Sequence, residues 1–223
     1  MKRFVVMISV LVIIYFGLAV YKNCELENER KKTNITVEDV EKIEKYINQI
    51  YMWKEITQEA IPTFSNINEA NPLWLWNAVA KNIEDKEITY EVLMNKSKEL
   101  FDCNLEFPKE GDWYIMPYDG VYYVEGINLD NEEDKFLISN IIKTENGYEV
   151  NIIEYLEDNM YLEENKIIIK NTTGKIIGNI PNTDYKIIDF VKVNKKEFIQ
   201  KKLILKCKED RLYVEKVGLN EGE

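Results

Sequence analysis

The sequence predicts an α+β fold in which a transmembrane helix is followed by about three helices that pack on a curved antiparallel meander sheet. Three observations predict it. An uncharged apolar run opens the chain, apolar residues then recur at three- and four-residue steps up to Phe101, and from Asp112 onward they alternate with a period of two. The chain has 223 residues, 45% of them hydrophobic, which is enough for a packed core.

The amino-terminal segment predicts a membrane anchor. Residues 1–3 form a short basic stub, and residues 4–21 carry no charge. An apolar helix of that length spans roughly 27 Å, close to the hydrocarbon thickness of a bilayer. Because Lys2 and Arg3 favour the cytoplasmic side, we expect a single-pass protein of the cell membrane with its carboxy-terminal domain outside. The alternative is a cleaved signal peptide and a secreted protein.

Residues 22–35 are polar and predict a stalk, and residues 36–223 then form the extracytoplasmic domain. Thr36 and Asp39 have the spacing of a capping box. The apolar residues of 37–51 share one face of the helix that starts there.

A second helix is predicted over 73–83, since Asn71-Pro72 supplies an N-cap and a proline at the first helical position. Trp74 and Trp76 lie in a run of four apolar residues that points all round this helix, which therefore must be covered on several sides. The alternative is a tryptophan exposed to a partner or ligand, with Trp74, Trp76 and Trp113 as the candidates.

The third helix is predicted over 89–101, and after it Asp-Gly, Asn-Gly and similar turns separate short alternating runs typical of hairpins. The predicted strands are 113–118, 121–127, 135–142, 148–156, 167–170, 175–180, 185–193, 198–208 and 211–217.

The order of an anchor, helices and then hairpins over residues 36–218 resembles extracytoplasmic proteins that carry an NTF2-like, or more loosely cystatin-like, domain. Such domains occur in Gram-positive surface proteins and in inner-membrane components of conjugation and secretion machines. The resemblance implies a bacterial protein that binds or assembles. It assigns no functional residue.

Composition excludes several classes of site. The chain has no His, so a Ser-His-Asp or Cys-His nucleophile site and a His-ligated metal are excluded. A net charge of −11 argues against a nucleic-acid binder. Among 40 acidic residues no carboxylate pair stands out. The sequence therefore predicts no catalytic residue, no metal and no cofactor, and it leans away from an enzyme.

The charge is unevenly placed. Residues 130–164 carry 11 acids and two lysines, whereas residues 185–208 carry eight lysines and two acids. Lys202, Lys206 and Lys208 alternate along one predicted strand and form a basic stripe. The stripe is either a solvent-facing or edge strand, or a patch for an anionic wall polymer or an acidic protein partner.

The cysteines allow three interpretations. Cys207 shares a strand face with Leu203 and Leu205, which predicts a buried thiol. A Cys103–Cys207 disulfide is an alternative in an exterior compartment, and Cys24 at the membrane edge is a candidate for acylation or for linking two chains.

Three functions remain open. The first is a non-catalytic exterior domain, held at the membrane, that binds or scaffolds an unknown ligand. The second is a cell-wall glycan hydrolase that uses two carboxylates about 5–9.5 Å apart. The third is an assembly subunit of an envelope secretion or conjugation machine.

Overall fold

The structure is a computed structural model, and it describes residues 35–52, 59–104, 115–118, 121–124, 134–156, 160–163, 166–171, 173–181 and 185–220. The predicted anchor at 4–21 and nearly all of the predicted stalk lie outside these residues. Within the described ranges, no helix has the length and apolar character needed to cross a bilayer.

The predicted α+β class is confirmed, with helices alongside antiparallel sheets. The described helices are α2 (Val37–Ile50), η1 (Ile67–Glu69), α4 (Pro72–Lys81), α5 (Tyr90–Phe101), α6 (Tyr185–Val193) and η3 (Lys195–Glu197). The described strands are β1 (Glu87–Ile88), β2 (Ile115–Tyr118), β3 (Val121–Val124), β4 (Asp134–Thr144), β5 (Gly147–Leu156), β6 (Met160–Glu163), β7 (Lys166–Lys170), β8 (Ile176–Pro181), β9 (Ile199–Lys208) and β10 (Arg211–Leu219).

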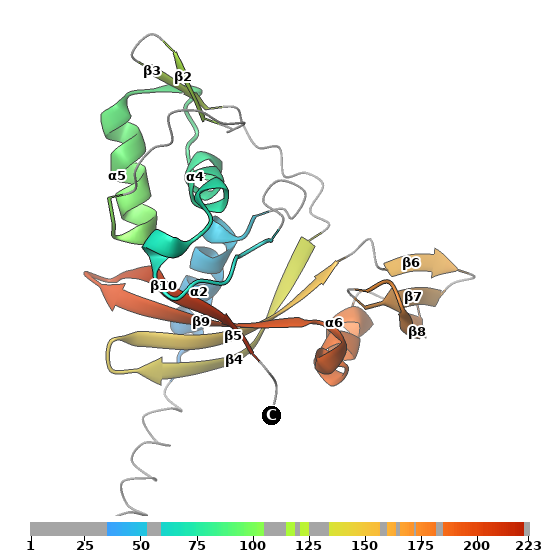
Figure 1. The fold of residues 1–223 in the computed structure, drawn as a ribbon. Helices are drawn as coiled ribbons and strands as arrows, with labels where there is room; N and C mark the ends of the chain where they lie inside the picture. Colours follow the sequence, from blue (N-terminus) through green and yellow to red (C-terminus); the bar gives the residue numbers. More distant parts are fainter. Residues whose placement is uncertain are drawn as a thin grey trace, which may run out of the picture.

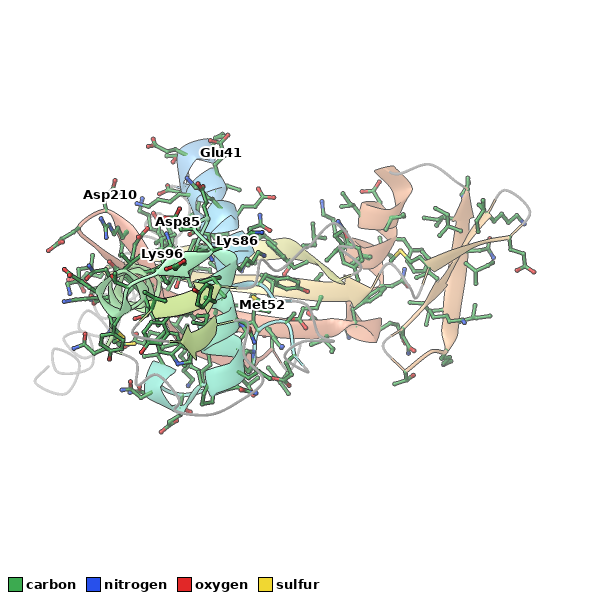
Figure 2. The ribbon with its side chains drawn as sticks, turned by 90° about the horizontal axis from the view of Figure 1, so that it is seen from above. Glu41, Met52, Asp85, Lys86, Lys96 and Asp210 are labelled. Carbon is green, nitrogen blue, oxygen red and sulfur yellow. The ribbon has the colours of Figure 1, made fainter. Side chains whose placement is uncertain are left out.

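The strands that the structure describes form three antiparallel sheets, so the expectation of one meander is wrong. The main sheet has the order β10-β9-β5-β4, and the two smaller sheets have the orders β1-β3-β2 and β6-β7-β8. Helices α2, α4 and α5 lie over one face of the main sheet (Figure 1). The small sheet β6–β8 and helix α6 project from one end of the molecule, away from those helices, as Figure 2 shows from above.

The three predicted amino-terminal helices are confirmed together with their caps. The side chains of Thr36 and Asp39 both contribute to the capping box of α2. Asn71 caps α4 by accepting from the Leu73 amide at 2.9 Å, and Thr89 caps α5. The carbonyls at the end of α2 are satisfied from α4, because the Lys81 ammonium donates to the carbonyls of residues 48 and 51 at 2.9 Å.

Residues 185–193 form helix α6, and the predicted strand there is wrong. Ile187, Phe190 and Val191 follow the three- and four-residue steps of a helix and pack into a second hydrophobic cluster beside the main core. Gly178 of β8 permits this packing, since a Cβ there would lie 2.7 Å from the Phe190 ring. The strand interpretation followed the many β-branched residues of this segment rather than their spacing.

The β4–β5 turn differs by one residue from the prediction. Thr144 pairs with Gly147, so the two turn residues are Glu145 and Asn146 rather than Asn146 and Gly147. Gly147 has another role: a Cβ at this position would lie 2.0 Å from the Leu205 backbone oxygen. Glycine is therefore required for the close approach of β5 to β9.

Candidate functional site

A cavity of about 450 Å³ lies where α5 ends beside the tip of the β9–β10 hairpin. We call it the hairpin cavity. It contains two lysines of the predicted stripe and both cysteines of the described chain, together with two carboxylates and three asparagines. Its lining residues are 66–68, 101–103, 146, 206–208 and 213–215.

Local backbone geometry places the charged side chains of the cavity. Helix α5 ends because Asp102 adopts a left-handed conformation with φ 50°. Its carboxylate oxygens then accept from the Lys208 ammonium at 2.9 and 3.0 Å. On the other side, Glu209 and Asp210 both have positive φ, as a two-residue hairpin turn requires, and reverse the chain from β9 into β10.

The predicted basic stripe is real, but acidic side chains pair with it. Lys202 lies 2.6 Å from Glu149, Lys206 is ion-paired with Glu215, and Lys208 with Asp102. The Asp102 hydrogen bond raises the pKa of Lys208. Strand β9 lies between β10 and β5, so the interpretation of an edge strand is wrong. Lys206 and Lys208 line the hairpin cavity, and Lys202 is not among its lining residues.

The two described thiols are free. Cys207 is exposed, so the prediction of a buried thiol is wrong. The burial of β9 ends at Leu205, and the last three residues of the strand, Lys206, Cys207 and Lys208, are all exposed. Cys103 is half-buried, and burial, with the nearby Asp102 charge, raises its pKa to about 11.

The structure places Trp74 and Trp76 in the core, where 0% and 1% of their surfaces are exposed. The Trp74 indole N–H donates to the carbonyls of Ile50 and Ala60 at 2.9 and 3.1 Å. Its ring lies 5.5 Å from that of Phe101, a cavity residue, so Trp74 supports the cavity from behind. Helix α4 is therefore covered on the sides that carry Trp74 and Trp76, as the sequence predicted. Trp113 lies outside the described residues.

A second hollow of about 550 Å³ adjoins the hairpin cavity and shares Asn146 and Cys207 with it. Here the Tyr148 hydroxyl donates to the Asp39 carboxylate, and the Lys143 ammonium lies 3.4 Å from the same carboxylate. The Tyr148 bond, with the Thr36 backbone N–H, holds the pKa of Asp39 well below its usual range. These contacts fasten the start of α2 to strands β4 and β5.

One buried pair was missed in the sequence. The Lys201 ammonium lies 3.2 Å from the Glu154 carboxylate, and their side chains are 3% and 0% exposed. The ammonium also donates to the Ile61 carbonyl. The two-residue period of β9 places Lys201 on the inward face with Leu203 and Leu205. A lysine at an inward position was the available signal, because a buried charge requires a partner.

The hairpin cavity suits polar recognition better than acid–base chemistry. Both carboxylates that line it, Asp102 and Glu215, are ion-paired with lysines. Among the residues that the structure describes, no group of three or more Cys, Asp or Glu side chains could hold a metal ion. Comparisons with protein-family models, with curated proteins and with solved structures find no match for this chain.

Proposed function

We propose that residues 36–223 are a non-catalytic binding domain, held outside the cell membrane by residues 4–21, and that the hairpin cavity receives a polar segment of a protein partner. The observation that carries this proposal is the charge arrangement of the cavity. Two lysine–carboxylate pairs and three asparagines offer donors and acceptors together. A peptide backbone with mixed side chains matches that pattern.

An anionic wall polymer suits the cavity less well. A polyanion is held by cations whose charge is not already balanced, and the three stripe lysines lie beside Glu149, Glu215 and Asp102. The ion pairs at Asp102 and Glu215 likewise disfavour the carboxylate-dependent glycan hydrolase, since neither carboxylate is placed as the protonated acid that such an enzyme needs.

The membrane anchor rests on the uncharged run at 4–21 and the basic stub before it. The mass of the mature protein tests it. An uncleaved anchor leaves the full chain in the membrane pellet after an alkaline wash, whereas a shorter chain in the medium would support the secreted alternative. The resemblance to NTF2-like domains stays a prediction.

Site-specific photo-crosslinking in native membranes tests the proposed binding. A photoreactive residue at Asn68, which lines the cavity, should give a discrete adduct with a second protein. The same photoreactive residue at Lys175, an exposed position in the turn between β7 and β8, is the matched control and should give no such adduct. Identical adducts at the two positions, or none at Asn68, would contradict the proposal. Adducts between two copies of this chain would favour the assembly subunit instead.

A charge-swapped variant sharpens the test. Lys206→Glu combined with Glu215→Lys keeps an ion pair across β9 and β10 and reverses the charge pattern of the cavity. We expect the Asn68 adduct to fall about tenfold, a loss of about 1.4 kcal/mol. A yield equal to that of the unswapped chain would show that the cavity charges do not select the partner.

A further inference from the structure

Both described cysteines line the hairpin cavity, although they lie far apart in the sequence. Cys103 follows the residue that ends α5, and Cys207 is the penultimate residue of β9. The residues beside them are joined, because Asp102 and Lys208 form an ion pair at 2.9 Å. The end of α5 and the end of β9 are therefore already tethered next to the two thiols.

We propose that the hairpin cavity is a thiol–disulfide exchange site, at which Cys207 and then Cys103 react with an external low-molecular-weight disulfide and finish joined as a Cys103–Cys207 disulfide. The inference depends on the proposed function in one respect: the exterior location supplies the oxidising surroundings in which the disulfide persists. It does not depend on the proposed partner.

The two thiols differ in exposure, as a reaction in two successive steps requires. Cys207 is exposed and lines the cavity, so an external disulfide can reach its sulfur. Cys103 is half-buried beside Asp102, and its raised pKa of about 11 keeps its thiolate fraction about a hundredfold below that of an ordinary thiol. Cys207 is therefore the attacking thiol, and Cys103 is the thiol that resolves the intermediate.

The reaction balances in two steps. The Cys207 thiolate attacks one sulfur of the external disulfide, whose S–S bond breaks, and one thiolate leaves. Cys103 then loses its proton and attacks the Cys207 sulfur of the mixed disulfide, and the second external thiolate leaves. The protein gives up two protons and two electrons, and the external disulfide is reduced to two thiols.

The product would alter the cavity itself. A disulfide holds its two Cα atoms about 4.4–6.8 Å apart, so the bond would fix the end of α5 relative to the tip of the hairpin. Oxidation would therefore lock this part of the cavity wall, and reduction would release it.

The test uses the full chain in mild detergent with Cys24→Ser, which removes the third cysteine. After incubation with oxidised glutathione, intact mass and peptide mapping should show a chain two hydrogens lighter with a Cys103–Cys207 link. In the added Cys103→Ser variant, a glutathione adduct should remain on Cys207. In the variant that carries Cys207→Ser as well as Cys24→Ser, the glutathione adduct on Cys103 should form about tenfold more slowly than the adduct on Cys207 does in the Cys103→Ser variant. The lower thiolate fraction of Cys103 slows the reaction, and the greater nucleophilicity of its thiolate offsets part of that loss.

Two outcomes would overturn the inference. One is a stable glutathione adduct on Cys207 beside a free Cys103 thiol in the Cys24→Ser chain, which keeps both cysteines. The other is disulfide formation no faster in the native chain than in urea, which would mean that the fold does not bring the thiols together. Neither readout needs a binding partner, so a failure here is distinct from a failure of the proposed function.

Discussion

Replacing Lys201 by Met removes the ammonium group that lies 3.2 Å from the buried Glu154 carboxylate. At an effective dielectric constant of about 20, the attraction between two charges at that distance is about 5 kcal/mol. Removing one member of a buried ion pair typically destabilises a protein by about 3–5 kcal/mol. The Ile61 carbonyl also loses its donor. We therefore expect Lys201→Met to lower the free energy of unfolding by about 3–5 kcal/mol.

Urea denaturation of the full chain in mild detergent, followed by tryptophan fluorescence, measures this loss. All four tryptophans lie between residues 53 and 113, so the signal reports on the folded domain rather than on residues 4–21. The expected shift of the urea midpoint is about 1–2 M. The double variant Lys201→Met with Glu154→Leu should return to within about 1 kcal/mol of the wild type, because it leaves no buried charge at this pair.

The neighbouring lysine provides the control. Lys202 lies 2.6 Å from Glu149, but these side chains are 42% and 32% exposed. Solvent weakens such a pair, so Lys202→Met should cost at most about 1 kcal/mol. Equal losses for Lys201→Met and Lys202→Met would refute the reasoning, because burial would then not decide the cost.

The pH dependence provides a second check on Lys201→Met. Without the ammonium group, burial raises the pKa of Glu154 in the folded variant. A raised carboxyl pKa favours the folded state at low pH and disfavours it as the pH rises. The deficit of the variant should therefore be largest near neutral pH and shrink towards about pH 4.

Three further perturbations follow from single residues. Gly147→Ala should cost about 1–3 kcal/mol in urea denaturation, since the added Cβ meets a backbone oxygen of β9 at 2.0 Å. Gly218→Ala, whose Cβ would meet nothing within 4 Å, should change stability by less than about 0.5 kcal/mol, and equal effects would contradict the steric account. The lowered pKa of Asp39 stabilises the fold above its ordinary value of 3.8, and that stability is lost as the pH falls below it. The melting temperature of Asp39→Asn should therefore vary less with pH, between about 4 and 2, than that of the wild type. An equal pH dependence in the two proteins would count against this role of Asp39. Asn77→Leu should raise stability by about 1 kcal/mol, because the fully buried Asn77 side-chain oxygen has no hydrogen-bond partner within the described structure. A melting temperature unchanged or lowered in that variant would argue against this account.

The helices were predictable because their signals are local. Thr36, Asn71 and Thr89 each cap a helix at the predicted position, and each cap needs only residues within one turn. The hairpins at 135–156 and 198–217 were predictable for the same reason. Helix α6 was missed because its β-branched residues favour a strand, although the spacing of Ile187, Phe190 and Val191 is helical and the helix packs against β8 and the end of β5.

The cavity was beyond the reach of these patterns. It brings together the end of α5, the segment around η1 and the tip of the β9–β10 hairpin. Each element has its own periodicity, but the place where neighbouring elements end relative to one another depends on tertiary packing. Cys207 illustrates the problem: the period of β9 assigns it to the face of Leu203 and Leu205, but it does not give the residue at which burial along that face ends.

The basic stripe shows why a charge count along the chain is a poor measure of surface potential. Residues 185–208 sum to a strongly positive segment. The partners of its three stripe lysines come from elsewhere: Asp102 follows α5, Glu149 is on β5 and Glu215 is on β10. Such pairs cancel the field at distances beyond their own separation, and salt screens what remains. Binding at this surface should therefore depend only weakly on ionic strength, whereas polyanion binding would weaken steeply as salt is added.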